Sequence, residues 1–167
     1  MNRLGVIAFV GAATAFVVTM QITIGRAGDE GSPIFGVQIP AGYPEWELIA
    51  PSHETCSFNE LRGILGNAVS TKAYRDGTLP FPDGAILAKL AWKHEPSPEF
   101  PGAFIPGHNT TVQIMVKDSK KFASTGGWGF GRFIDSKAVD RAQQETCFAC
   151  HQANVKDHDF VFTRFAP

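Results

Sequence analysis

Alternation between apolar and polar residues predicts the central strands of the protein. Residues 85–92 form an apolar run of strand length between turn residues, and the alternation puts Lys89 on an otherwise apolar face. Residues 111–116 alternate in the same way, with Gln113 on the face opposite the two valines. These two segments are the clearest strands that the pattern predicts.

Weaker patterns predict further strands. Glycines separate aromatic residues over residues 126–133, which indicates a strand that a neighbouring body approaches closely on one face. Residues 58–65 form a short mixed run, and residues 160–165 near the C-terminus are strand-like.

Capping residues predict three helices. The first covers residues 68–75, with Asn67 before it and Gly77 after it. The other two are a short helix that begins at Asp118 and runs through Phe122, and a longer helix that begins at Asp135 or Ser136 and runs to Cys147.

Two proline-rich segments are expected to lack regular structure. Residues 28–51 are predicted to be an extended lead-in, in which only residues 46–49 could pair as a strand. Residues 93–109 are predicted to be a loop, with Phe100 and Phe104 as its apolar anchors.

The N-terminus has the architecture of a signal peptide. Arg3 precedes an apolar stretch over residues 4–24, and Ala27 ends a small-x-small cleavage site. An uncleaved anchor helix is the alternative, because the stretch approaches the roughly 20 residues that span a bilayer. We expect residues 1–27 to be the signal peptide and residues 28–167 to be a single domain in the periplasm.

Charge and cysteine content narrow the class of protein. The chain has 15 basic and 16 acidic residues without a basic run, which gives no reason to expect nucleic acid or an anionic membrane as a partner. With only 3 cysteines, an exported domain has no framework of several disulfides. Cys56, which has no assigned role, is expected to be a buried apolar residue.

The sequence Cys147-Phe148-Ala149-Cys150-His151 is the attachment signature of c-type haem. On a helix these spacings share one face, so both thiols can add to the haem vinyl groups while the imidazole of His151 binds the iron. A redox dithiol or half of a zinc site are the alternatives, but the chain shows neither a βαβ context nor an obvious second ligand pair. Export also favours haem, and the sequence predicts one covalently bound haem c.

The sixth iron position distinguishes electron carriers from haems that bind ligands. Met115 is the only methionine after the signal peptide, and its position in a strand is typical of ordinary packing. The other histidines are expected to be surface or loop residues: His53, His94, His108 and His158.

Several segments together resemble the cytochrome P-460 family of small c-type haem proteins. Their order and spacing match over most of the chain after Trp46. The segments are Phe81-Pro82-Asp83-Gly84 followed by Lys89, Val116-Lys117-Asp118, Gly127-Trp128, the haem motif, and Asp159 through Phe165.

The resemblance implies an α+β fold that is mainly β, an antiparallel sheet with flanking helices and the haem attached at a C-terminal helix. It also implies a homodimer with an open distal side. Members of the enzyme branch oxidise hydroxylamine, pass electrons to a periplasmic carrier and carry a lysine bonded to a haem meso carbon; Lys89 stands at that position. In the related branch, cytochrome c-prime-beta, aromatic side chains cap a pocket that binds nitric oxide.

The chemistry of Lys89 is consistent with this role. An ammonium buried among apolar neighbours costs several kcal/mol, so Lys89 should be neutral, exposed or paired. A neutral amine is a nucleophile. The alternative is a face open to water, or a sheet edge where a lysine blocks mispairing.

Two residues are compared with the distal positions of the family: Gln113 departs from the enzyme branch and Arg62 matches the family. Gln113 occupies the place of a glutamate in the enzyme branch, and glutamine cannot act as a general base. Arg62 matches a distal arginine that could hold a ligand oxygen or a haem propionate; an exposed strand arginine is the alternative.

The haem motif and the resemblance leave three alternative functions. The first is hydroxylamine oxidation, with Lys89 tuning the haem while Gln113 and Arg62 hold the ligand. The second is binding of nitric oxide without turnover, with Phe81, Phe100 or Phe104 capping the iron. The third is electron transfer, with Met115 as the sixth ligand.

Overall fold

The computed structural model describes residues 31–166. The expected signal peptide, its cleavage site and the alternative anchor helix lie outside these residues. Within residues 31–166, no helix is long and apolar enough to cross a membrane.

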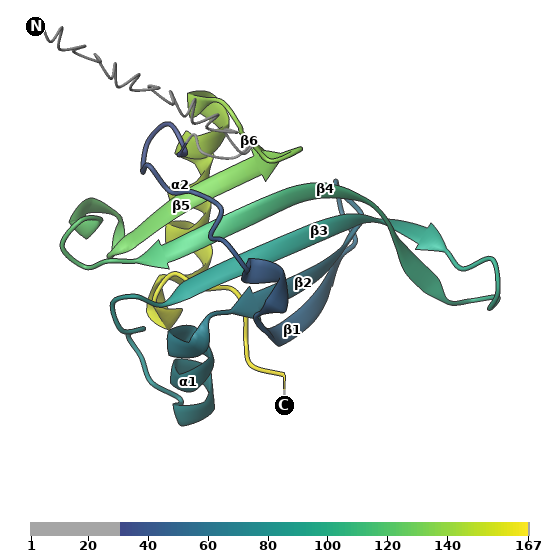
Figure 1. Cartoon of the computed structure of the whole chain (residues 1–167), viewed down its shortest axis with the longest axis horizontal. Helices are drawn as coiled ribbons and strands as arrows, with labels where there is room; N and C mark the ends of the chain where they lie inside the picture. The colour runs from purple at the N-terminus through teal and green to yellow at the C-terminus, as the bar shows by residue number, and fades with distance from the viewer. Residues whose placement is uncertain (1–30, 167) are drawn as a thin grey trace, which may run out of the picture.

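The fold is α+β and mainly β, as the resemblance implied. Six antiparallel strands form one sheet in which each strand pairs with the next along the chain (Figure 1). The strands are β1 (Glu47–Glu54), β2 (Glu60–Gly66), β3 (Ile86–Pro96), β4 (Phe104–Lys117), β5 (Trp128–Ile134) and β6 (Lys137–Ala138).

Two α-helices and three short 3₁₀ turns flank the sheet. The helices are α1 (Ala68–Asp76) and α2 (Arg141–Val155), and the turns are η1 (Tyr43–Glu45), η2 (Ala123–Thr125) and η3 (Lys156–His158). In Figure 1, α2 lies behind the sheet near β5, and α1 lies at one end of the first strands.

The helix α1 confirms the prediction from capping residues. The side chain of Asn67 accepts a hydrogen bond from the backbone N–H of Ser70, which satisfies a free donor of the first turn. Gly77 ends the helix with a φ of 64°, a left-handed conformation that favours glycine.

The two faces of the sheet are covered by different parts of the chain. One face, which includes Leu87 and Phe130, packs against Phe148 of α2. On the other face, Val37 of the lead-in packs in a cluster with Ile114. The glycines of β5 permit this, since a Cβ at Gly129 would lie 2.4 Å from the Phe122 ring.

The prediction of a loop over residues 93–109 is wrong. β3 continues to Pro96 and β4 begins at Phe104, so these residues form a hairpin that projects past the neighbouring strands (Figure 1). Two register shifts near Trp92 absorb the irregular sequence. Phe100 is 69% exposed and Phe104 is 52% exposed, so neither is a buried anchor.

β1 is longer than the sequence indicated. It continues from Glu47 through Pro51 to Glu54. An edge strand tolerates a proline because one side of its backbone needs no partner.

Two predicted helix starts are also wrong. Asp118 accepts hydrogen bonds from the N–H groups of Lys120 and Lys121, but only a turn follows, and η2 begins later. Asp135 and Ser136 have φ values of 48° and 62° and form the turn between β5 and β6. The cap of α2 is Asp140, whose side chain accepts from the N–H of Gln143.

The C-terminal segment 160–165 forms no strand. It runs along the domain in an extended path that the N–H of Ala166 ties to the carbonyl of Ile49 at 3.0 Å. The hydroxyl of Tyr74 also donates to the carbonyl of Thr163. Aromatic alternation here reflects packing against the core rather than strand pairing.

Candidate functional site

The helix α2 places the motif residues on one wall of a cavity. Cys147, Cys150 and His151 all line this cavity, whose volume is about 440 Å³. Their shared face follows from the helical spacing that the sequence predicted. Strands β2 to β5 supply most of the opposite wall.

The register of the sheet brings the predicted distal residues together. Ile64, Lys89, Gln113 and Arg132 are direct neighbours across four strands, so they form one row on the wall that faces α2. Arg62 also lines the cavity and pairs with Ala91 in the adjacent row. Lys89, Gln113 and Arg62 therefore share one cavity with the motif of α2.

His151 is held by a backbone hydrogen bond. Its Nδ1 lies 2.7 Å from the carbonyl oxygen of Phe160, and a carbonyl can only accept, so Nδ1 carries the hydrogen. The rings of Phe130 and Phe162 stand edge-on to the imidazole. Burial lowers the pKa of His151, which favours the neutral ring and leaves Nε2 as a free electron-pair donor.

The two thiols differ in exposure. Cys147 is half-buried, Cys150 is exposed, and neither forms a disulfide. Burial raises the pKa of Cys147, although the charges of Arg132 and Lys89 oppose this shift.

Lys89 is a half-buried lysine on an interior strand. Burial, together with the nearby positive charge of Arg62, lowers the pKa of Lys89 to about 8. Since β3 lies between β2 and β4, the alternative of an edge lysine is excluded. A lysine with this pKa has an appreciable neutral fraction near neutral pH, and the neutral form is nucleophilic.

Arg62 is paired with Glu60 at the cavity wall. Arg62 Nη2 donates to Glu60 Oε2 at 3.1 Å, and the hydroxyl of Thr110 donates to Glu60 Oε1 at 2.6 Å. Burial alone would raise the pKa of Glu60, but these hydrogen bonds lower it, so the carboxylate is ionised. Glu60 is 5% exposed, and sequence reasoning missed it because its burial depends on the strand register.

Sequence reasoning also missed Arg132. Its Nε is buried in the cavity wall without a hydrogen-bond partner. Its guanidinium lies 6.0 Å from the centre of the Phe58 ring. An unpartnered buried guanidinium donor calls for an anionic acceptor such as a carboxylate. The alternation of β5 could have placed Arg132 on the face of Phe130, but not its lack of a partner.

The residues present fit a covalently held haem. Two thiols and a neutral imidazole share one helix face, apolar side chains such as Leu87 and Phe130 line the space between helix and sheet, and Arg132 offers a free donor for a carboxylate. The zinc alternative finds no support here, because residues 31–166 contain no group of three His, Cys, Asp or Glu side chains placed to hold a metal.

Several candidates lie away from the cavity. Met115, Phe81, Phe100 and Phe104 are not among its lining residues, so the cavity lends no support to methionine ligation or to these aromatic caps. Phe81 is instead buried against Trp128 and Tyr74 in the core. The aromatic side chains that line the cavity are Phe58, Phe130 and Phe162.

The remaining histidines and Cys56 also lie outside the cavity, where His151 is the one lining histidine. His53 stacks on His94, and His158 bonds the carbonyl of Val161. Cys56 is exposed, so the prediction of a buried residue is wrong. It lies in the turn between β1 and β2, where the Glu54 carboxylate accepts its backbone N–H.

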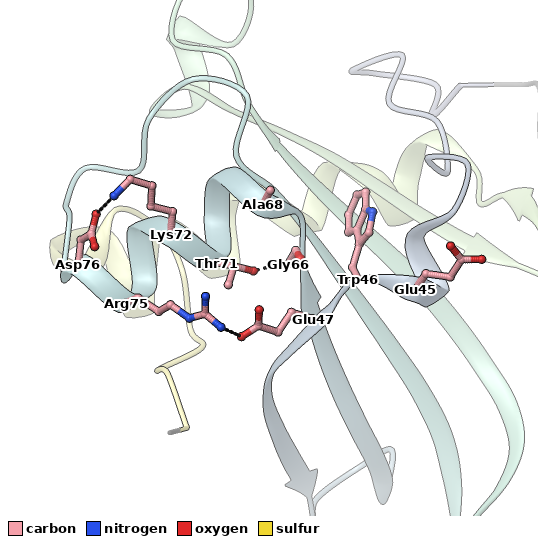
Figure 2. Close-up of a pocket in the computed structure, with 9 residues that line it drawn as sticks. All are labelled: Glu45, Trp46, Glu47, Gly66, Ala68, Thr71, Lys72, Arg75 and Asp76. Atoms are coloured by element: carbon pink, nitrogen blue, oxygen red, sulfur yellow. Dashed lines mark hydrogen bonds and ion pairs between the residues drawn. The ribbon is translucent and has the colours of Figure 1, made fainter.

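A second cavity of about 670 Å³ lies between α1 and the start of β1 (Figure 2). Four of the charged side chains that line it form ion pairs with one another, Arg75 with Glu47 and Lys72 with Asp76. None of the candidate residues lines this second cavity. The cavity of about 440 Å³ beside α2 is therefore the candidate haem site.

Comparison with known proteins identifies the family of the chain. A family model described as Cytochrome P460 matches residues 40–163. No curated protein matches the sequence. The matched region includes all the strands, both helices and every residue of the cavity described above. A cytochrome family implies that the chain binds haem.

Proposed function

Because the chain belongs to the cytochrome P460 family, we propose that it is a periplasmic c-type cytochrome with one haem that oxidises hydroxylamine. The observation that carries this proposal is the shared cavity, in which the Cys147, Cys150 and His151 face of α2 opposes the row that contains Lys89 and Gln113.

The cofactor would be haem c, held by thioether bonds to Cys147 and Cys150. The haem would supply a redox-active iron that takes electrons from a bound substrate. His151 Nε2 would bind the iron, since Nδ1 is committed to Phe160. The free Nε of Arg132 would donate to a haem carboxylate.

Lys89 would form a third covalent bond to the haem macrocycle, in addition to the two thioether bonds. Its neutral amine would form a bond to a meso carbon in place of one N–H and one C–H bond. This releases two protons and two electrons, which an oxidant such as hydrogen peroxide would take up. The low pKa of about 8 supports this step because it makes the nucleophilic amine available.

The distal residues would bind and deprotonate the substrate. Gln113 would orient hydroxylamine through its amide, which already donates to the Thr111 hydroxyl at 3.2 Å. Arg62 is fixed by Glu60 and would hold the substrate oxygen. Glu60 is the one carboxylate among the cavity-lining residues, and it would take the proton that Gln113 cannot.

Export, assembly and partners are parts of the same proposal. The signal-like N-terminus supports a periplasmic location, with an electron-transfer protein of that compartment as acceptor. A homodimer is supported by the exposed apolar side chains of the β3–β4 hairpin, among them Phe100 and Phe104.

Binding of nitric oxide without turnover is the second candidate. The observation that favours it is Gln113 itself, because an amide beside the iron can hold a small ligand but cannot take its proton.

Visible spectroscopy of the purified cytochrome tests the proposal. We expect a red-shifted ferrous Soret band that Lys89→Ala converts to an ordinary high-spin band, and reduction of an added electron acceptor by hydroxylamine. Nitric oxide binding without acceptor reduction would favour the second candidate. A protein with no haem band in pyridine would contradict both.

A further inference from the structure

Asp159 joins three segments that are far apart in the sequence. Lys117 Nζ donates to its two carboxylate oxygens at 2.8 and 2.9 Å, and the backbone N–H of Phe81 donates to Oδ2 at 2.8 Å. The indole N–H of Trp128 donates to the Asp159 carbonyl at 2.8 Å. The family-like segments around residues 81–84, 116–118 and 127–128 thus meet at one residue.

The ion pair of Lys117 and Asp159 is buried. The side chains are 6% and 9% exposed, so water screens their attraction little. Lys117 Nζ also donates to the carbonyl of Gly126 and lies over the Trp128 ring. Loss of either charge would leave the other buried without a partner.

This ion pair holds an unusual turn that follows the motif helix after the short 3₁₀ turn η3. Asp159 and Phe160 have φ values of 47° and 61°, a left-handed conformation that a bulky residue such as phenylalanine rarely adopts. Room for the Phe160 ring comes from Gly126, where a Cβ would lie 2.1 Å from the ring. The turn therefore depends on its surroundings.

The carbonyl of this turn is the acceptor for His151. Phe160 O accepts the Nδ1 hydrogen at 2.7 Å, and the backbone N–H of Phe160 is bound to the carbonyl of Val155. The orientation of the peptide after Phe160 therefore fixes the imidazole.

We propose that Lys117 and Asp159 are positioning residues for His151: their ion pair holds the Asp159–Phe160 turn so that the Phe160 carbonyl orients the ring and strengthens its electron donation to iron. This inference rests on the proposed haem function. A partner that accepts the second N–H of a ligating histidine raises the basicity of the ligand and stabilises ferric iron. Loosening the turn should weaken that donation.

The test uses the haem-loaded protein and the variants Asp159→Asn and Lys117→Met. Each removes one charge at nearly unchanged volume. We expect a higher reduction potential, with the ferric-to-ferrous ratio at a fixed potential falling about tenfold, which is about 59 mV for one electron. We also expect a lower iron–histidine stretching frequency in the resonance Raman spectrum of the ferrous protein.

Val37→Ala is the control, because Val37 is buried in the cluster on the other face of the sheet. It should lower thermal stability but leave the potential and the Raman band unchanged. A higher potential with a lower iron–histidine stretching frequency in either charge variant, absent from Val37→Ala, supports the proposal, and shifts of the opposite sign overturn it. Unchanged values in both charge variants, or an equal shift in Val37→Ala, overturn it. A wild-type protein without haem contradicts both the proposed function and the positioning role. A haem-loaded protein whose charge variants keep the wild-type values contradicts the positioning role alone.

Discussion

Lys89 of β3 and Gln113 of β4 are directly opposite each other in the sheet, and both side chains line the cavity that faces the motif helix. Ile64 and Arg132 extend the pair into a row across four strands. One strand register therefore sets the relative positions of the amine, the amide and the guanidinium.

The pKa of Lys89 predicts a pH dependence of stability. We consider the haem-free protein, prepared as the double variant Cys147→Ser and Cys150→Ser. The folded pKa of about 8 is below the ordinary 10.5, so the folded state binds fewer protons than the unfolded state between these values. The free energy of unfolding should therefore rise as pH rises from 8 to 10.5.

In the same background, Lys89→Met should remove this rise and increase stability below pH 8 by up to about 3.5 kcal/mol, at about 1.4 kcal/mol per pKa unit. Urea unfolding at several pH values measures both effects. Lys93→Met, an exposed change on the same strand, should stay within about 0.5 kcal/mol of the parent. A parent protein with no rise over this window would show that Lys89 keeps an ordinary pKa.

Gln113→Glu should increase hydroxylamine turnover. A carboxylate at this position would supply a second general base, and positioned bases contribute about 10²-fold or more to rate. Arg132, its neighbour across β4 and β5, would keep the new carboxylate ionised. Steady-state kinetics with an electron acceptor measure the change. If kcat stays the same, proton removal does not limit the reaction, or it takes place elsewhere.

Arg132→Met should have opposite effects on the two forms of the protein. It should stabilise the haem-free form, because Arg132 Nε is buried there without a partner. It should destabilise the haem-loaded form by about 1.5–3 kcal/mol, the range for hydrogen bonds to charged groups. Denaturant unfolding of both forms measures the difference.

The matched control for Arg132→Met is Arg75→Met, which breaks an exposed ion pair with Glu47. It should change both forms by less than about 1 kcal/mol. Equal effects of Arg132→Met on the two forms would mean that Arg132 does not bind the haem.

Locally determined elements could be predicted from the sequence. Asn67 and Gly77 mark the ends of α1 because capping involves only neighbouring residues. The spacing of the cysteines and His151 likewise predicts one helix face, and alternation placed Lys89 on the same face as Leu87, which lines the same cavity.

Features that depend on distant segments could not be predicted. The hairpin over 93–109 forms because β3 and β4 pair along their whole length, which outweighs the prolines. The partner of Glu60 and the missing partner of Arg132 depend on which strands lie side by side. Asp135 and Asp140 are equally good caps by composition, and only the β5–β6 turn decides between them.

The intact mass of the mature protein tests the central claim most directly. We predict the mass of the polypeptide plus one haem when the protein comes from cells that attach haem, and the mass of the polypeptide alone for the double variant Cys147→Ser and Cys150→Ser. A wild-type mass equal to that of its amino acids would contradict the account.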